Sequence, residues 1–307
     1  MLRIATRQSR LALWQAEFVA AQLRRRHPQL DVQLVPMTTQ GDRVLDRALA
    51  QIGGKGLFIK ELEAAILEGR ADIAVHSMKD VPGDMPAGMT IAAMLPREDP
   101  HDAFVSSKYA SIEELPPGAR VGTSSLRRQC QMKSLRPDLQ VLPLRGNVET
   151  RLRKLDAEEY HAIILAAAGL IRLGLERRIA RRIDFKQSLP AVGQGIVGIE
   201  CRADDEQSLS LIQALDDSEA RCCCEAERAF ALRLQGSCQS PIAGFARLLG
   251  DEIELQGLVG SEDGATIYRA GDRAARSNAC ELGTKLANRL LAAGADKLLA
   301  EQRRATT

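Results

Sequence analysis

Short apolar segments alternate with amphipathic ones near the start of the chain, and this alternation limits the fold more than any other feature. Leu2–Ala5, Val32–Pro36 and Ile73–His76 have the length and the apolar residues of buried strands. Between them, Leu11–Arg25 and Leu57–Leu67 have the apolar spacing of helices. A β-α-β-α-β order of this kind predicts a parallel sheet with helices on its faces.

The same alternation returns between residues 101 and 190. Pro96 and Pro100 precede this segment, and Pro190 with Gly193-Gln194-Gly195 follows it, so both boundaries are typical of hinge-like crossings. The expected strands are Ala119–Gly122, Val141–Leu144 and Ala162–Ala166, and the expected helices are Ser125–Leu135, Val148–Asp156 and a basic stretch that runs to about Arg182.

From about Ser218 the pattern changes to a mixture of helices and strands. A helix is expected to Leu234, strands at Ile253–Val259 and Thr266–Ala270, and an amphipathic helix at Leu282–Ala292. We therefore expect an α/β protein with two similar doubly wound domains, like those of periplasmic binding proteins, and a small α+β C-terminal domain. The expected ranges are 1–95 with 196–214, then 101–190, and finally 218–307.

Composition excludes several classes of partner. Aromatic residues are only 3% of the chain and the net charge is +2, which argues against a surface for nucleic acid. No apolar run has the length of a membrane span, and no secretory signal is visible at the N-terminus. The odd number of cysteines, 7, without spaced pairs, is typical of reduced thiols. We expect a cytoplasmic protein with no metal site.

Polar residues follow the predicted strands, and many of them are basic. In a parallel sheet these strand ends meet at one edge, where ligands bind. Arginines in the first turn of a helix are unfavourable unless an anion compensates them, and hydroxyl groups and guanidiniums suit a carboxylate or phosphate. A single such arginine is usually a solvated surface residue, but the recurrence in both domains predicts an anion-binding cleft. The residues are Arg7, Ser9, Lys79, Asp80, Thr123, Ser124, Ser125, Arg127, Arg128, Arg145, Gly146, Arg151 and Arg172.

Three further features have both a functional and a structural interpretation. Asp80 is the only acid among the strand-end residues, and it suits either proton transfer and cation stabilisation or an internal salt bridge. Cys238 lies in a loop, where a cysteine is either an attachment point or inert. The Gly53-Gly54-Lys55-Gly56 segment, with Phe58, forms either a mobile loop over the cleft or an ordinary surface turn. Cys222, Cys223 and Cys224 are expected to pack in a core.

In sequence order, several motifs together resemble the porphobilinogen deaminase family over nearly the whole chain. They are Ile4-Ala5-Thr6-Arg7-Gln8-Ser9, Gly53-Gly54-Lys55-Gly56-Leu57-Phe58, His76-Ser77-Met78-Lys79-Asp80-Val81-Pro82, Gly122-Thr123-Ser124-Ser125-Leu126-Arg127-Arg128, Leu144-Arg145-Gly146-Asn147, Leu189-Pro190-Ala191-Val192-Gly193-Gln194-Gly195 and Gly236-Ser237-Cys238-Gln239-Ser240-Pro241. Ser237, Ser240 and Arg10 depart from the residues usual in that family.

The resemblance implies a transferase that condenses four porphobilinogen molecules into hydroxymethylbilane for haem synthesis. It implies a dipyrromethane cofactor on Cys238 through a thioether, Asp80 as the catalytic carboxylate, and a monomer whose partner is the small-molecule substrate. The strand-end residues above, with Lys55, Phe58 and Gln194, would hold cofactor and substrate. The alternative is a non-catalytic two-lobed protein that binds carboxylates, for which the absence of a signal peptide is unfavourable.

Overall fold

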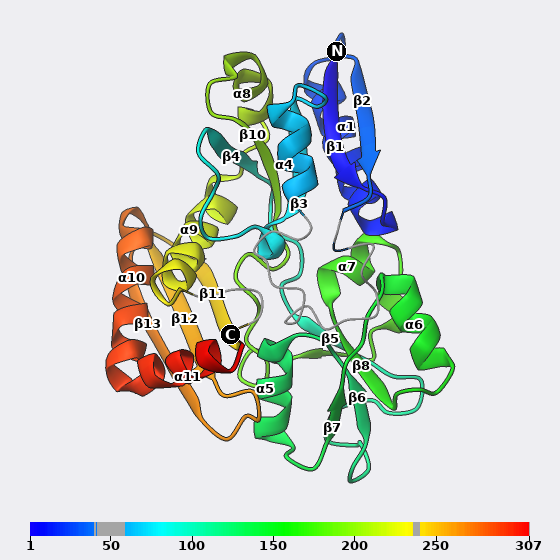
Figure 1. The fold of residues 1–307 in the computed structure, drawn as a ribbon, viewed down its shortest axis with the longest axis vertical. Helices are drawn as coiled ribbons and strands as arrows, with labels where there is room; N and C mark the ends of the chain where they lie inside the picture. The colour runs from blue at the N-terminus through cyan, green and yellow to red at the C-terminus, as the bar shows by residue number, and fades with distance from the viewer. Residues whose placement is uncertain (40, 42–58, 236–239, 307) are drawn as a thin grey trace.

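The first lobe is a five-stranded sheet in the order β2-β1-β3-β10-β4. The computed structural model, in which this sheet is seen at the top of Figure 1, describes residues 1–39, 41, 59–235 and 240–306. Strands β2, β1 and β3 are parallel, as predicted, but β10 is antiparallel to both of its neighbours, so the sheet is mixed. The strands are β1 (Leu2–Arg7), β2 (Val32–Met37), β3 (Ile73–Ser77), β4 (Met89–Met94) and β10 (Val197–Arg202).

Helices cover both faces of this sheet because alternate strand residues point to opposite sides. Ile4 and Ile73 belong to a fully buried cluster with α1 (Arg10–Arg26) and α8 (Glu206–Gln213). The next residues along the strands, Ala5 and Ala74, pack with α4 (Lys60–Leu67) on the other face. The two apolar faces are buried by different helices, and the parallel strands β1, β2 and β3 end at the same edge of the sheet.

The second lobe repeats this design with the strand order β7-β6-β8-β5-β9. Strands β6, β7 and β8 are parallel, whereas β5 is antiparallel to both β8 and β9. The elements are β5 (Asp102–Val105), β6 (Arg120–Gly122), α5 (Leu126–Leu135), β7 (Gln140–Leu142), α6 (Val148–Asp156), β8 (Ala162–Ala166), α7 (Ala167–Arg172), η2 (Glu176–Arg178) and β9 (Arg181–Ile183).

The predicted basic helix to about Arg182 is wrong in its second half. Helix α7 ends at Arg172, and Gly174 takes a backbone φ of +68°, which few residues other than glycine adopt. The chain then turns through η2, and Arg181–Ile183 forms the edge strand β9. Tertiary pairing with β5 therefore overrides a local sequence that is compatible with a helix.

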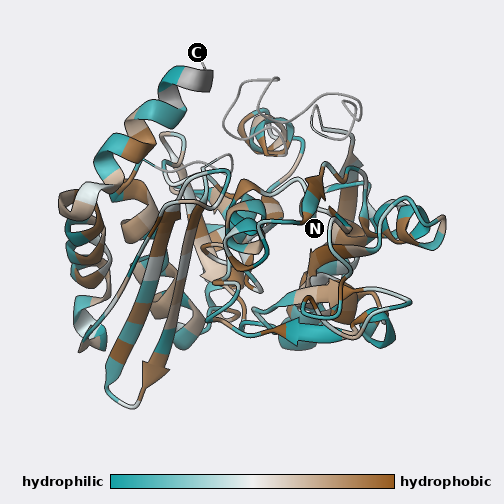
Figure 2. Ribbon diagram, turned by 90° about the horizontal axis from the view of Figure 1, so that it is seen from below, coloured by the Kyte–Doolittle hydropathy of each residue, from teal (hydrophilic) through white to brown (hydrophobic). Residues whose placement is uncertain are grey.

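The C-terminal domain is a three-stranded antiparallel sheet covered on one face by helices. Phe230 of α9 is fully buried among residues of the sheet and of α10. Figure 2 shows hydrophilic and hydrophobic residues alternating along strands of this sheet, which fits a sheet covered on one face. The elements are α9 (Ser218–Arg233), β11 (Ile242–Leu249), β12 (Glu252–Gly260), β13 (Ile267–Ala275), η3 (Arg276–Asn278), α10 (Ala279–Leu290), η4 (Leu291–Ala295) and α11 (Asp296–Thr306).

Two of the three consecutive cysteines of α9 pack in the core as predicted, since Cys224 is fully buried and Cys223 is 6% exposed, whereas Cys222 is half-buried at the edge of the core. Burial raises the pKa of the Cys223 and Cys224 thiols to about 12, so both remain protonated and unreactive near neutral pH. Among the described residues, no group of His, Cys, Asp and Glu side chains is placed to hold a metal ion. No helix in the described part of the chain is long and apolar enough to span a membrane.

The two lobes and the C-terminal domain meet at the chain crossings. Arg97, in the first crossing, donates to the Glu227 carboxylate of α9 at 2.7 Å and to the Gln194 carbonyl at 3.2 Å. The same carboxylate accepts the backbone N–H groups of Gly193 and Ala246, at 2.7 and 2.8 Å. One buried carboxylate thus holds both crossings against the C-terminal domain. Burial raises its pKa in spite of the Arg97 charge.

Candidate functional site

The first lobe contributes the ends of β1 and β3, which lie side by side in the sheet. Arg7 is the last residue of β1, and Ser9 caps α1 by accepting the Ala12 N–H at 3.4 Å. After β3 the chain makes a short 3-10 turn, η1 (Met78–Asp80), which carries the half-buried Lys79 and Asp80. The Arg228 guanidinium of α9 donates to the Pro82 carbonyl at 2.8 Å and so holds the segment that follows this turn.

In the second lobe, the hydroxyl groups after β6 shape the backbone. Thr123 Oγ1 accepts the Ser125 N–H at 3.2 Å, and the Ser125 side chain caps α5. Ser124 Oγ donates to the Leu144 carbonyl at 2.9 Å and accepts the Leu144 N–H at 3.0 Å. These bonds tie the turn after β6 to the turn after β7, a local role that the strand-end pattern did not predict.

Arg127 and Arg128 share one buried carboxylate, that of Asp102. Arg127 Nη1 lies 2.7 Å from Asp102 Oδ2, and Arg128 Nη2 lies 2.7 Å from Asp102 Oδ1. The same carboxylate accepts bonds from Ser188 Oγ at 2.7 Å and from Gln194 Nε2 at 3.1 Å. Burial alone would raise the pKa of Asp102, but the two guanidiniums outweigh burial and hold it well below its usual range.

Asp102 corrects two predictions. A bound anion is not the only compensation for Arg127 and Arg128, and Asp80 is not the only acid near the strand ends. The missed residue is the first of β5, and it pairs in register with Ala166, the last residue of β8. Because β5 is antiparallel, its start lies at the edge where the parallel strands end. The sequence feature that could have indicated this strand is the apolar run Ala103-Phe104-Val105, which directly follows the acidic residue Asp102.

Arg151 lies among like charges from both lobes. Its Nε donates to the Gly146 carbonyl at 2.8 Å, and Gly146 has a φ of +105° that favours glycine. Burial lowers the pKa of Arg151 to about 10, with further lowering by Arg128, Arg145 and Arg7 and an opposing effect of Asp80. Arg7 and Asp80 of the first lobe are therefore within electrostatic reach of the arginines of the second lobe.

Lys79 is the second perturbed cation. Burial lowers its pKa to about 8, and Arg128 and Arg127 lower it further, while Asp80 and Asp102 oppose the effect. The ammonium group of Lys79 is surrounded by protein atoms, although the residue as a whole is only half-buried. We call the group formed by Arg7, Lys79, Asp80, Asp102, Arg127, Arg128, Arg145 and Arg151 the charged cluster. It holds more cations than carboxylates, so it is suited to a ligand with several negative charges.

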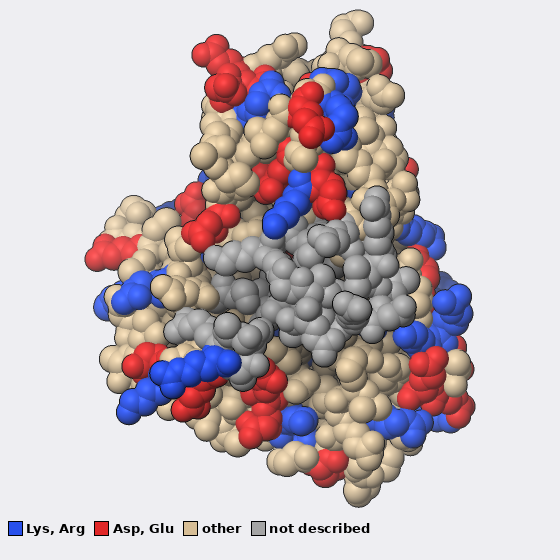
Figure 3. All heavy atoms as spheres, in the orientation of Figure 1, with Lys and Arg blue, Asp and Glu red and all other residues tan. Residues whose placement is uncertain are grey.

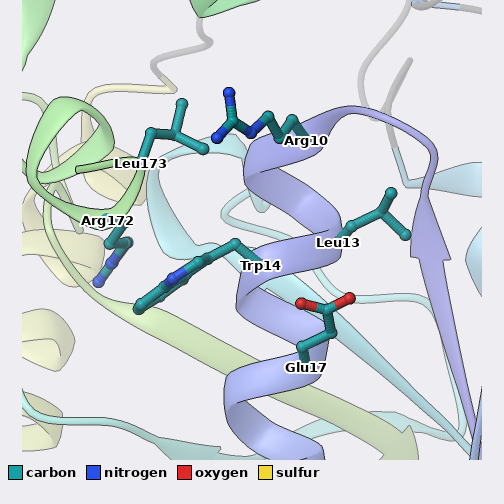
Figure 4. Close-up of a pocket in the computed structure, with 6 residues that line it drawn as sticks. All are labelled: Arg10, Leu13, Trp14, Glu17, Arg172 and Leu173. Carbon is teal, nitrogen blue, oxygen red and sulfur yellow. The ribbon is translucent and has the colours of Figure 1, made fainter. Parts of the chain in front are cut away.

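Of two further predicted site residues, Gln194 lies beside the charged cluster and Arg172 lies apart from it. Gln194 is fully buried, and its Nε2 donates to the Pro100 carbonyl at 2.7 Å as well as to Asp102. Arg172 lies away from the cluster, between α7 and α1, where Nη2 donates to the Gly195 carbonyl at 2.7 Å and its guanidinium carbon is 5.8 Å from the centre of the Trp14 ring (Figure 4).

Other predicted residues have different outcomes. His76 has a structural role, with Nε2 2.8 Å from Glu200 Oε2 in a buried pair. Lys55, Phe58 and Cys238 lie outside the described residues. On the face shown in Figure 3, the coloured acidic and basic side chains are interspersed.

Solved structures with a similar fold include bacterial solute-binding proteins. The methionine-binding protein MetQ is 16% identical with a TM-score of 0.46, and the match covers 72% of this chain and 91% of that one. A Burkholderia cenocepacia nutrient-binding protein bound to methionine is 14% identical with a TM-score of 0.45, covering 72% and 93%. The Bordetella pertussis BvgS VFT2 domain is 14% identical with a TM-score of 0.43, covering 69% and 84%. At these values the likenesses say nothing about ligands.

Two family models match the chain and together span most of it. The model of the porphobilinogen deaminase dipyrromethane cofactor binding domain matches residues 2–210, which contain every described member of the charged cluster. The model of the porphobilinogen deaminase C-terminal domain matches residues 221–292. Dipyrromethane is thus the cofactor for which the larger domain is named, and the chain belongs to the porphobilinogen deaminase family.

Proposed function

We propose that this protein condenses four porphobilinogen molecules head to tail, releases ammonia at each addition and finally releases hydroxymethylbilane for haem synthesis. It would act as a monomer in the cytoplasm, with dipyrromethane attached to Cys238 through a thioether. The observation that carries this proposal is the charged cluster. In this cluster six cations, Arg7, Lys79, Arg127, Arg128, Arg145 and Arg151, stand against the two carboxylates of Asp80 and Asp102.

The described residues fit a dipyrromethane with acetate and propionate side chains. The pKa of Arg151 is lowered first by burial and then by the charges of Arg128 and Arg145, and bound carboxylates would offset both effects. Asp102 already compensates the Arg127–Arg128 pair, which leaves Arg145 and Arg151 as the stronger candidates for direct carboxylate binding. When bound, dipyrromethane supplies a pyrrole α-carbon that takes the next porphobilinogen unit.

Asp80 is the half-buried carboxylate available for the developing positive charge. It follows β3, and Arg228 restrains the segment after it. Its carboxylate would accept pyrrole N–H hydrogen bonds, stabilise the cation formed as ammonia leaves and receive the proton that the pyrrole carbon loses. Lys79 and the arginines would hold the carboxylates of the substrate and so orient its ring.

Intact-protein mass spectrometry tests the attachment. The purified full-length chain is expected to carry the added mass of one dipyrromethane, and the Cys238→Ser variant is expected to have its bare mass. Cys280→Ser is the matched control, because Cys280 is an exposed cysteine of the described part of the chain. A wild-type protein of bare mass that consumes no porphobilinogen would refute the proposal.

Asp80→Asn tests the role of the carboxylate. The amide keeps the size but neither stabilises a cation nor accepts a proton, so we expect the rate of ammonia release to fall about 100-fold or more. Cofactor mass on the chain is expected to persist. The control is Asp84→Asn, four residues further along the same segment. An Asp80→Asn variant with wild-type turnover would remove Asp80 from the mechanism.

A further inference from the structure

A groove of about 330 Å³ lies between α1 of the first lobe and α7 of the second, outside the charged cluster. It is lined by Arg10, Leu13, Trp14, Glu17, Arg172 and Leu173 (Figure 4). This volume is at the lower end of the range for small-molecule sites. Its lining combines an aromatic ring and two leucines with two cations and one carboxylate, which is the mixed chemistry of a site for a small charged ring compound.

The α1 side of the groove is built on one helix face. Arg10, Leu13, Trp14 and Glu17 follow an i, i+3, i+4, i+7 spacing, so they lie on one face of α1. Trp14 also stacks on Phe18, with ring centres 5.2 Å apart and planes 8° apart. The stacked partner fixes the indole, and the other side of the groove presents the Arg172 guanidinium to it, with its carbon 5.8 Å from the ring centre.

The charged side chains that line the groove make few or long polar contacts with the rest of the protein. Arg10 Nη1 lies 3.4 Å from Glu149 Oε1, a long contact whose arginine side chain is 66% exposed. Within the described residues Glu17, which is exposed, has no hydrogen bond or ion pair. Arg172 uses one nitrogen for the Gly195 carbonyl, which leaves its other guanidinium N–H groups for a ligand.

This combination matches one ligand class: a planar heterocycle with carboxylate arms and a primary ammonium group. We infer that the groove is a docking site for incoming porphobilinogen before it enters the charged cluster. Arg10 and Arg172 bind its acetate and propionate groups, Trp14 contacts its pyrrole ring, and Glu17 accepts hydrogen bonds from its aminomethyl ammonium group. The inference rests on the proposed function for the identity of the ligand.

The contact of Arg172 with Gly195 adds a link to the domain junction. Gly195 follows Gln194, which donates to the Asp102 carboxylate of the charged cluster. A ligand bound to Arg172 therefore contacts a side chain that is itself hydrogen-bonded to Gly195 of the second crossing. The docking site and the charged cluster are thus joined through Gly195 and Gln194.

Trp14 offers a direct measurement, because the chain has 1 tryptophan. The probe is a pyrrole with acetate and propionate arms but no aminomethyl group, which cannot lose ammonia and is not condensed. Titration into the full-length wild-type protein is expected to change the fluorescence of Trp14 in a saturable manner. Arg10→Gln removes one charged partner of a carboxylate, so its dissociation constant in this titration is expected to rise about tenfold.

Arg25→Gln is the matched control, because Arg25 is an exposed arginine in the last turn of the same helix. It is expected to titrate like the wild type. Equal dissociation constants for Arg10→Gln and Arg25→Gln, or a Trp14 signal that does not respond to the probe, would overturn the inference.

Glu17→Gln tests the ammonium contact with porphobilinogen itself. We expect kcat/KM to fall several-fold and kcat to stay unchanged, because Glu17 lies outside the charged cluster. Binding of the probe, which has no ammonium group, is expected to stay as in the wild type. A kcat/KM equal to that of the wild type would contradict the Glu17 contact.

The two proposals fail in distinguishable ways. An active enzyme with a silent Trp14 refutes the docking site and leaves the deaminase function intact. A protein of bare mass without activity, whose Trp14 nevertheless titrates with the probe in an Arg10-dependent manner, refutes the function and leaves a pyrrole-dicarboxylate site.

Discussion

At the residue scale, the arginines that follow the strands have two different roles. Arg127 and Arg128 are buried and share the Asp102 carboxylate, so they are held as part of the second lobe. Burial lowers the pKa of Arg145 and Arg151, whose charges add to the positive potential beside Arg128. The same residue type after different strands is therefore structural at Arg127 and Arg128 and, in the proposed function, binds a ligand at Arg145 and Arg151.

Asp102→Asn is expected to destabilise the fold strongly. Loss of the charge leaves two buried guanidiniums without a counter-ion, so urea unfolding should show a loss of about 3–5 kcal/mol. Asp156→Asn, at the exposed pair with Arg178, is the control and should unfold like the wild type. Equal midpoints for the two variants would contradict the structural role of Asp102.

The same carboxylate predicts how stability depends on pH. The folded-state pKa of Asp102 lies well below the usual value of 3.8, so its stabilising contribution is complete above that pH. The contribution is lost as the pH falls below 3.8 towards the folded-state pKa. The slope of unfolding free energy against pH in this acid range should be smaller in Asp102→Asn than in the wild type.

Lys79 predicts a change in substrate recognition near pH 8. Its folded-state pKa of about 8 means that the ammonium group is lost as the pH rises through that value. If it binds a substrate carboxylate, kcat/KM should decline above that pH. Lys79→Arg keeps its charge and should remove this inflection while other ionisations remain. If the Lys79→Arg variant kept the same inflection in its pH profile of kcat/KM, the inflection would belong to a group other than Lys79.

At the element scale, antiparallel strands complete the site. β5 brings Asp102 to the edge at which β6 and β8 end, and the second crossing, which leads into β10, brings Gln194 against it. The sequence rhythm predicted the parallel strands and their helices but missed β4, β5, β9 and β10 of the lobes and β11 of the C-terminal domain. A short strand whose neighbours are distant in sequence has no local signal beyond a few apolar residues.

Gly195→Ala tests how closely the two crossings pack. Gly195 has a φ of +88°, and a Cβ there would overlap the carbonyl oxygen of Glu98 in the other crossing. Gly174→Ala is matched in conformation, with a φ of +68° and open space around the new methyl group. The control should lose about 1–2 kcal/mol from backbone strain alone, and Gly195→Ala should lose more in thermal unfolding. Equal losses would show that the crossings adjust.

At the scale of the whole molecule, Glu227 joins three parts of the chain. It pairs with Arg97 of the first crossing, accepts Gly193 N–H of the second, and belongs to α9 of the C-terminal domain. Helix α9 is therefore fixed to the junction between the lobes. In the proposed function, the attachment residue Cys238 follows this helix in the sequence.

Glu227→Gln should weaken this junction. Arg97 would be left without its counter-ion, so we expect a loss of about 3–5 kcal/mol and a calorimetric unfolding curve that separates into two transitions. Glu225→Gln is the control on the same helix, where the carboxylate is 43% exposed and 3.7 Å from Arg221. A single unchanged transition in Glu227→Gln would show that apolar packing alone joins the domains.

The sequence by itself determined the fold class, the strands β1 to β3 and β6 to β8, and the family. Short-range apolar periodicity and contiguous motifs carry that information, because both are local in the chain. Only the tertiary structure decided that Asp102 compensates Arg127 and Arg128, that Arg172 faces Trp14, and that Glu227 joins the crossings. Arg127 and Asp102 are 25 residues apart in the sequence, Arg172 and Trp14 are 158 apart, and Arg97 and Glu227 are 130 apart. Charge pairing over such separations depends on how the sheets and helices pack, which no local pattern encodes.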